Sequence, residues 1–231
     1  MMTKASMIVS PIGLKWLGLL AVAGLLLCGA AARAQQFSAD LVVMPHDGVA
    51  AVSAGKLRVS DDKVRLETPE LADGFFLIDG AGPSAYFVRP AAQVFMDAKQ
   101  SSRLPQMFVP LDPGDPCRQW QAMAKLADAG DGDNPWRCQR IGEAIIDGRR
   151  TAAYRAISPS GRDIVGWIDP ELKFPLRIRM EDGATITVQN IQQGPLPARL
   201  LEIPPGFRKF DPQALINRIK QSDVWVDKPQ P

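Results

Sequence analysis

Few side chains in this sequence combine the chemistry of a catalytic nucleophile, base or metal ligand with a suitable spacing. His46 is the only histidine among the 231 residues. A histidine-rich metal site is therefore excluded, and a Ser-His-Asp triad would depend on this one residue. It lies in the segment Pro45-His46-Asp47-Gly48, which is typical of an exposed turn, and no Gly-x-Ser-x-Gly segment occurs.

Two further patterns have the spacing of a site but not its context. Ser53 and Lys56 form a Ser-x-x-Lys pair, as in penicillin-recognising enzymes, but the Ser-Asp-Asn and Lys-Thr-Gly segments of such enzymes are absent. A calcium loop counted from Asp131 would place Trp136 where glycine is needed and Gly142 where glutamate is needed. We therefore predict no catalytic residue, no metal and no cofactor, and we expect that the protein is not an enzyme.

Cys117 and Cys138 predict a structural disulfide. The third cysteine, Cys28, lies in an apolar leader, so removal of the leader leaves an even number of cysteines. An even number in an exported protein favours pairing, and closure of this loop stabilises the fold by about 3 kcal/mol in the chain-entropy model. A redox or metal site is disfavoured because the sequence has no Cys-x-x-Cys segment.

Residues 1–34 have the layout of a cleaved secretory signal. Lysines precede an apolar run over 16–32, and Ala32-Arg33-Ala34 supplies small residues for cleavage after Ala34. Lipid attachment at Cys28 is disfavoured, because it needs a small preceding residue and Leu27 occupies that place. The alternative is an uncleaved inner-membrane anchor, since the run is near the lower limit for a spanning helix. We expect export to the periplasm.

The charge of the mature chain excludes another class of partner. Removal of residues 1–34 leaves 24 basic and 25 acidic side chains in 197 residues. A near-neutral chain does not have the positive surface of nucleic-acid-binding proteins, so we expect no nucleic-acid partner. The length suits a single domain over 35–221 followed by a flexible tail over 222–231, and we expect a monomer.

Alternating apolar residues and turn signals predict a mainly β chain. The expected strands occupy 37–44, a hairpin over 55–68, three runs within 74–98, a hairpin turning at Asp147-Gly148, the pair 162–169 and 174–181, and 184–194. The strand at 174–181 separates apolar from charged side chains most clearly: Phe174, Leu176, Ile178 and Met180 on one face, and Arg177, Arg179 and Glu181 on the other.

Two helices are expected beside these strands. Asp115-Pro116 begins one that runs to about Ala129, and Asp211-Pro212 begins a short terminal one. Prolines interrupt 103–116 too often for regular structure. We predict one antiparallel sheet of about nine to eleven strands, curled into an incomplete barrel and covered by the mid-chain and C-terminal helices.

Two segments resemble a known superfamily. The segments are GWIDPELKFPLRIRMEDG at 166–183 and LEIPPGFRKFD at 201–211. They are similar to the LolA/LolB-like superfamily of periplasmic lipoprotein carriers, and the order of elements follows that fold over roughly 37–211. The resemblance implies an incomplete barrel closed over by helices and loops. Roles within such a fold are diverse, so the resemblance alone does not give a function.

The leading hypothesis is a carrier or sensor that holds a lipid or lipoprotein acyl chain on the apolar face. Each buried methylene contributes about 0.8 kcal/mol, so no polar motif is needed. Met107 and Phe108 are candidates for a movable lid, or else they fill one end of the core. The candidate ligand-binding residues are Phe75, Phe87, Phe95, Met107, Phe108, Trp167, Leu176, Ile178 and Met180, with Leu77, Ile186 and Val188 on the same face.

The alternative hypothesis is an envelope protein-interaction module whose core is filled and holds no ligand. Its partner would then bind on the polar outer face near Arg177 and Arg179, or along an open strand edge. The two hypotheses differ in one observable property, which is whether the apolar interior is hollow.

Overall fold

The computed structural model describes residues 35–45, 50–98, 104–126 and 134–221. The predictions on the leader, on His46, on Asp131 and on the tail over 222–231 lie outside these residues.

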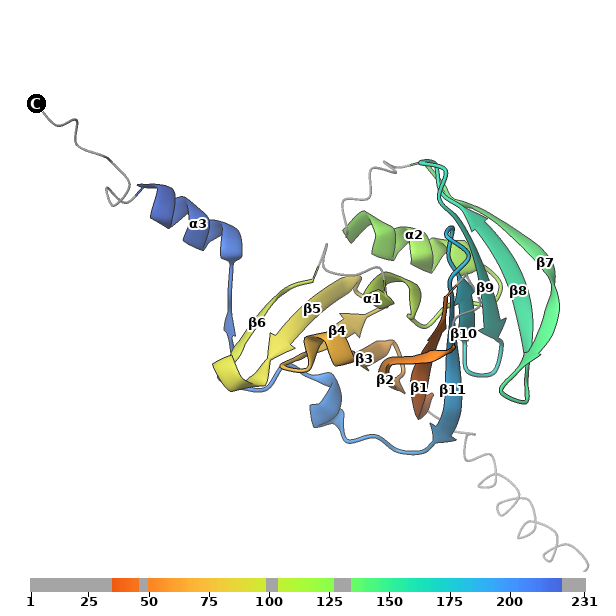
Figure 1. Cartoon of the computed structure of the whole chain (residues 1–231), viewed down its shortest axis with the longest axis horizontal. Coiled ribbons are helices and arrows are strands. Elements are labelled where there is room, and N and C mark those ends of the chain that lie inside the picture. Colours follow the sequence, from red (N-terminus) through yellow and green to blue (C-terminus); the bar gives the residue numbers. More distant parts are fainter. Residues whose placement is uncertain (1–34, 46–49, 99–103, 127–133, 222–231) are drawn as a thin grey trace, which may run out of the picture. The chain divides into compact units, whose positions relative to one another are not determined.

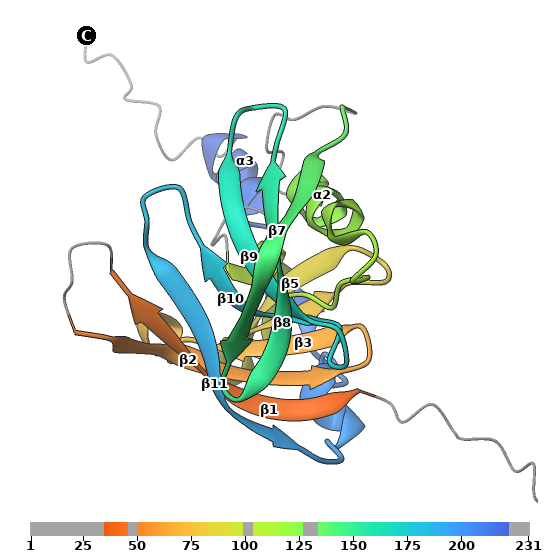
Figure 2. The same cartoon turned by 90° about the vertical axis from the view of Figure 1, so that its right-hand side faces the viewer.

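One sheet of 12 strands dominates the described chain, in the order β12-β6-β5-β4-β3-β2-β1-β11-β10-β9-β8-β7. The sheet is not closed, because β12 and β7 lie at its opposite ends (Figures 1 and 2). The strands are β1 (Gln36–Met44), β2 (Val52–Ser60), β3 (Lys63–Glu67), β4 (Phe75–Asp79), β5 (Ser84–Arg89), β6 (Val94–Asp97), β7 (Arg137–Ile146), β8 (Arg149–Ile157), β9 (Asp163–Asp169), β10 (Phe174–Arg179), β11 (Thr185–Gln193) and β12 (Arg208–Lys209). The mainly β class and the incomplete barrel are confirmed.

The strand count exceeds the expected nine to eleven because of β12. This strand has two residues and pairs parallel with β6, through Arg208 opposite Val94 and Lys209 opposite Phe95. A two-residue strand has no alternation to detect, and its partner is more than 100 residues away. The other strand pairs are antiparallel, as expected.

Local sequence explains the tight turns. Asp147 and Gly148 both have positive φ, 49° and 74°, as a two-residue hairpin turn of the right twist requires. Figure 2 shows how strongly the sheet twists, since β1–β3 run crosswise to β7–β9 in that view. Strong twist is the ordinary consequence of right-handed strand geometry in a sheet this wide.

Short helices accompany the sheet: α1 (Leu104–Met107), α2 (Pro116–Leu126), α3 (Pro212–Gln221) and the 3-10 helices η1 (Pro69–Leu71), η2 (Pro90–Ala92) and η3 (Ala198–Leu201). The proline-rich segment is thus partly helical, contrary to expectation. Helix α2 begins where Asp115 accepts a hydrogen bond from the Arg118 amide at 3.4 Å. None of the helices in the described residues is long and apolar enough to cross a membrane.

The two predicted cover helices differ in their packing. Helix α2 buries Trp120, Met123 and Ala124 and is joined to β7 by the predicted Cys117–Cys138 disulfide, with a Cα–Cα distance of 5.7 Å. Helix α3 buries no residue, and its apolar side chains Leu215 and Ile216 are exposed. The expectation that α3 covers the sheet is therefore wrong: its amphipathic pattern does not identify which surface, if any, it packs against.

Buried apolar residues form two clusters, one on each face of the sheet. The main cluster lies on the inner face, against α1 and α2, and includes Phe37, Leu57, Leu66, Phe76 and Trp120. The second cluster lies on the outer face of β4–β6, where Ile203 and Phe207 from the C-terminal segment pack against Phe75, Leu77 and Val88.

Candidate binding groove

Five of the nine predicted ligand-binding residues lie together in the main cluster. Leu176, Ile178 and Phe108 are completely buried there, and Met107 and Phe87 are nearly so. Met180 is partly buried at the margin of this cluster. Trp167 contacts the cluster but lies opposite Arg177 in the β9–β10 register, so the prediction that it shares the face of Leu176 is wrong. Sequence alternation therefore predicted the inner side chains of β10 correctly.

The side chains from α1 and α2 fill the space beside these residues. The Phe108 ring centroid lies 6.4 Å from that of Phe174, which in turn packs edge-on against Phe37 at 5.3 Å. Trp120 donates from Nε1 to the Met107 carbonyl at 3.1 Å and reaches Gly166 on β9. In this structure Met107 and Phe108 therefore occupy the core-filling position, the alternative to an open lid.

Phe75 and Phe95 do not share the inner face. The structure places them with Leu77 on the outer face, while Phe76 and Ile78 point into the main cluster. The prediction that Phe75 and Leu77 line the same face as Leu176 is wrong. The run Gly-Phe-Phe-Leu-Ile is continuously apolar, so it has no alternation from which the inward positions can be identified.

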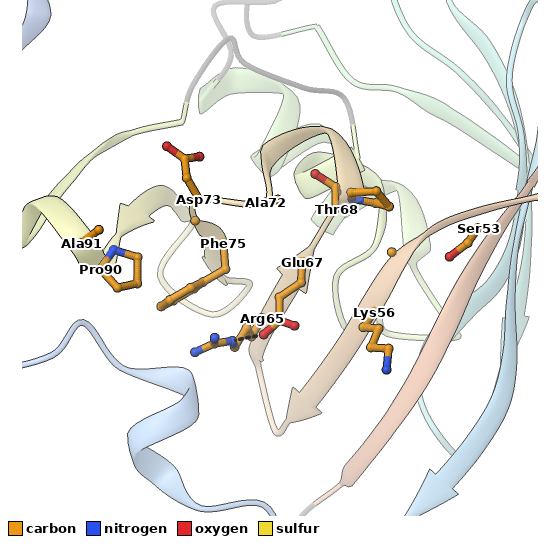
Figure 3. A pocket seen from close by; sticks show the side chains of 13 residues that line it. Ser53, Lys56, Arg65, Glu67, Thr68, Ala72, Asp73, Phe75, Pro90 and Ala91 are labelled. Atoms are coloured by element: carbon orange, nitrogen blue, oxygen red, sulfur yellow. Dashed lines mark hydrogen bonds and ion pairs between the residues drawn. The ribbon is translucent and has the colours of Figure 1, made fainter.

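The open hollow next to Phe75 is the candidate site. It is a groove of about 650 Å³ on the outer face, between β2, the end of β3, η1 and η2 (Figure 3). Its side near β2 is polar and carries Ser53, Lys56 and Thr68. Its opposite side is formed by Phe75 and Pro90. A polar wall facing an apolar one suits a ligand with both kinds of group.

Arg65 and Glu67 form the floor between these walls. The Arg65 guanidinium lies 3.5 Å from the Phe75 ring centroid and donates to Glu67 at 2.8 Å and to the Leu200 carbonyl at 3.3 Å. Arg58 donates to the same Glu67 oxygen at 2.7 Å. Burial raises the pKa of Glu67, but the hydrogen bonds and charges of Arg65 and Arg58 outweigh burial and lower it. Glu67 is therefore ionised, and its Oε1 accepts from both arginines, while its Oε2 forms no hydrogen bond with the described residues.

The Thr68 side chain in the groove wall has a hydroxyl group that forms no hydrogen bond. The residue is 7% exposed, and its Oγ1 has no hydrogen-bond partner. A buried polar group without a partner costs about 1–3 kcal/mol, so such groups are uncommon in native structures. Gly55 lets the β2 backbone approach this segment closely: a Cβ at Gly55 would lie 2.0 Å from the Glu67 carbonyl oxygen and 3.3 Å from the Thr68 Cα.

Lys56 lies on the same side and forms no ion pair with the described residues. In register it lies between Asp40 on β1 and Glu67 on β3. Glu67 is held by two arginines, and Asp40 accepts a hydrogen bond from Asn190 at 2.9 Å. Among the residues that the structure describes, neither carboxylate forms an ion pair with Lys56. Across the groove Asp73 pairs with Arg89, so its charge is neutralised locally.

The groove also contains the Ser-x-x-Lys pair of the sequence. Ser53 and Lys56 both line it, so the Ser-x-x-Lys pair dismissed in the sequence does share one surface, on a strand rather than at a helix start. Within the described residues no three His, Cys, Asp or Glu side chains are placed to hold a metal ion. The sequence contains no detectable signal for Thr68, because its isolation results from packing between segments far apart in the chain.

The structure also describes the two surfaces predicted to bind a protein partner, which are the outer face near Arg177 and Arg179 and an open strand edge. The guanidinium carbons of Arg177 and Arg179 lie 5.8 Å and 6.0 Å from the Trp167 ring centroid, and Arg177 donates to Thr187 Oγ1 at 3.2 Å. Strand β7 forms an open edge of the sheet and is exposed along most of its length.

Similarity to known proteins is found among solved structures. No family model matches the chain, and no curated protein matches it. Among solved structures, an uncharacterized conserved protein from Thermus thermophilus matches with a TM-score of 0.44 and 12% identity, over 78% of this chain and 91% of that one.

Two other solved structures match at similar levels. A putative outer membrane lipoprotein-sorting protein domain from Vibrio parahaemolyticus has a TM-score of 0.34 and 10% identity, over 72% of this chain and 89% of that one. The MucA/MucB complex of Pseudomonas aeruginosa gives 0.35 and 13%, over 71% of this chain and 54% of that one, so this chain spans about half of its length. A lipoprotein-sorting domain is thus among the structural neighbours, as the resemblance predicted. Because these TM-scores are below 0.5, the proposals below depend on the residues of this chain.

Proposed function

We propose that this protein is an exported, non-catalytic binding module of the cell envelope, with a filled core, that binds its partner in the outer groove. The contrast between the two faces of the sheet supports this function most directly. On the inner face, Trp120 and Phe108 fill the space beside Leu176 and Ile178. On the outer face, a groove of about 650 Å³ remains open next to the unpartnered Thr68 hydroxyl.

Export to the periplasm is part of this proposal. The Cys117–Cys138 disulfide supports it, since structural disulfides persist in oxidising compartments. The disulfide anchors α2 to β7, on the side of the sheet where α2 contributes its buried residues. A covalent link between α2 and β7 favours the conformation in which the side chains of α2 fill the core.

A carrier of an acyl chain is the second candidate, and the α1 segment supports it. The last residue of α1, Met107, and the stretch 108–111 that follows it contribute Met107, Phe108, Val109 and Leu111 to the main cluster. The hydrogen bonds of this segment include Leu111 N to the Lys173 carbonyl at 2.7 Å and Trp120 Nε1 to the Met107 carbonyl at 3.1 Å. If it lifted, it would open an apolar surface beneath it. In such a carrier, the acyl chain would have to replace the buried side chains of this segment in the core.

Native mass spectrometry of the exported protein, purified without detergent, distinguishes the two candidates. The filled-core module predicts a monomer mass of 197 residues less two hydrogens, with no lipid adduct. A lipid adduct that is lost in Leu176→Ala but kept in Leu77→Ala would establish the carrier instead. Both leucines are buried, on opposite faces of the sheet, so the pair controls for general destabilisation.

Photocrosslinking tests the location of partner binding. A photoreactive amino acid replaces exposed Ser53 in the groove or, as the control, exposed Lys63 outside it. Discrete adducts that form in the periplasm at position 53 and not at 63 support partner binding in the groove. Equal labelling at both positions, or none at 53, contradicts it.

A further inference from the structure

Helix α3 presents an apolar stripe to solvent. Its residues Leu215, Ile216 and Ile219 are 41%, 43% and 46% exposed, and the helix buries none of its residues. At 3.6 residues per turn, these three side chains lie on one side of the helix. A contiguous exposed stripe of this kind indicates a contact with another surface.

The nearby strands of the sheet do not offer that surface. Strand β12 pairs parallel with β6, and the Phe210 amide donates to the Phe95 carbonyl at 2.7 Å. The chain therefore leaves the sheet beside the Asp97 end of β6, and α3 begins there, at Pro212. Among the described residues, the large exposed apolar side chains outside 210–219 lie on β1, β2, η1 and β7, and none lies on β4, β5 or β6. The surface that covers the stripe must therefore come from outside the chain.

Basic side chains border the stripe on both sides. Arg218 lies one turn after Leu215, and Lys220 lies one turn after Ile216. Both basic residues are exposed, and neither forms an ion pair with the described residues. Long basic side chains can lay their apolar stems along such a stripe while their charged ends stay in the polar layer beside it.

Negative charge is scarce on this helix. Asp211 precedes it, and its Oδ1 accepts the amides of Gln213 and Ala214 at 2.9 Å and 3.1 Å as the helix cap. Residues 212–221 contain no Asp or Glu. A matching surface is therefore apolar in its depth and anionic at its rim, as is a membrane interface with anionic lipids. A second copy of α3 would bring the same excess of positive charge, which disfavours pairing of two such helices.

We propose that α3 is an interfacial anchor, which lies in the plane of an anionic membrane surface with its apolar stripe among the upper acyl chains and its two cations at the lipid phosphates. This role goes beyond the proposed function, because α3 contributes no residue to the groove. The anchor would hold the binding module at the membrane whatever occupies the groove.

Co-sedimentation with lipid vesicles tests the anchor, with the exported, disulfide-bonded protein purified without detergent. We expect binding to vesicles of phosphatidylglycerol mixed with phosphatidylcholine, and much weaker binding to phosphatidylcholine alone. The affinity should fall as salt is raised, because salt screens the charges. Ile216→Gln should weaken binding about tenfold, since the burial of one large apolar side chain is lost. Lys220→Gln should weaken it about fivefold, the effect of one basic residue near an anionic surface.

Matched variants separate the anchor from general changes in the surface. Ile145→Gln removes an exposed isoleucine from β7, and Lys63→Gln removes an exposed lysine from β3. Both variants should bind vesicles like the wild type. Thermal unfolding of Ile216→Gln should also match that of the wild type, because this side chain belongs to neither buried cluster.

Three results would overturn the assignment of α3 as an anchor. The first is an equal loss of vesicle binding in Ile216→Gln and Ile145→Gln. The second is no vesicle binding at up to about 1 mM lipid, roughly tenfold above what a single myristoyl chain requires. The third is a dimer in sedimentation equilibrium that Ile216→Gln converts to a monomer, without vesicle binding, which would assign a second copy as the partner. None of these results bears on crosslinking at Ser53, so the groove is tested separately.

Discussion

The guanidinium of Arg65 stacks on the ring of Phe75 at 3.5 Å, and this contact joins the groove floor to the outer apolar cluster. Arg65 also bonds Glu67 and the Leu200 carbonyl, so one side chain connects β3, β4 and the C-terminal segment. Because its side chain is 17% exposed, these contacts are largely shielded from water. The groove and the segment that closes the outer cluster therefore depend on the same residue.

Replacement of Arg65 by methionine should destabilise the protein by about 1–3 kcal/mol. The substitution keeps an apolar stem but loses the stacking and leaves the Leu200 carbonyl without this donor. Urea denaturation measures the change. Arg177→Met, which also loses a contact to an aromatic ring but at 5.8 Å, is the comparison and should cost less than half as much.

Two buried threonines should respond oppositely to loss of the hydroxyl. Thr151 Oγ1 donates to the Ala144 carbonyl at 3.0 Å, whereas Thr68 Oγ1 has no partner. Thr151→Val should cost about 1 kcal/mol or more, while Thr68→Val should be neutral or stabilising. Thermal unfolding of both variants measures this difference. A marked destabilisation by Thr68→Val would show that its hydroxyl has a partner in solution.

Gly166 should not tolerate a methyl group. A Cβ there would lie 2.5 Å from Cη2 of Trp120, and both residues belong to the packed interior. Gly166→Ala should destabilise the protein by about 1–3 kcal/mol through overpacking. Gly194→Ala, which meets nothing within 4 Å, is the matched control and should be near neutral. Equal stability of the two variants would mean that the interior has room to spare beside Trp120.

Acid should weaken the protein partly through Glu67. Its pKa is lowered in the folded protein, so its carboxylate contributes stability above the unfolded-state value of 4.5. That contribution is lost as the pH falls below 4.5 and through the lower folded-state pKa. Glu67→Gln should therefore be less stable than the wild type at about pH 7 and lose less stability between about pH 5 and pH 3, as urea midpoints will show.

The regular part of the fold could be predicted because its signals are local. Asp147-Gly148 marked a hairpin, and the alternation of Leu176 and Ile178 with Arg177 identified the inner face of β10. The disulfide followed from an even cysteine count. In each case neighbouring residues carry the information, so no knowledge of the tertiary structure was needed.

The groove could not be predicted in the same way. Phe75 lies in a continuous apolar run, so the direction of its side chain depends on the register between β4 and its neighbours. Thr68 becomes isolated only when η1 packs beside β2, and β12 forms only when residue 208 reaches β6. Pairing between distant segments decides the direction of the Phe75 side chain, the isolation of Thr68 and the formation of β12. Sequence periodicity does not describe such pairing.

The position of β1 bears on when the sheet can be completed. This strand is the first of the domain, yet one of its edges pairs with β11 at residues 185–193. Its central pairing must therefore wait for nearly the whole chain, and closing so long a loop slows folding. A chain with this contact order resists premature folding while it is synthesised. Delayed folding of this kind would suit the proposed export, in which the polypeptide crosses a membrane as an extended chain and folds on the far side.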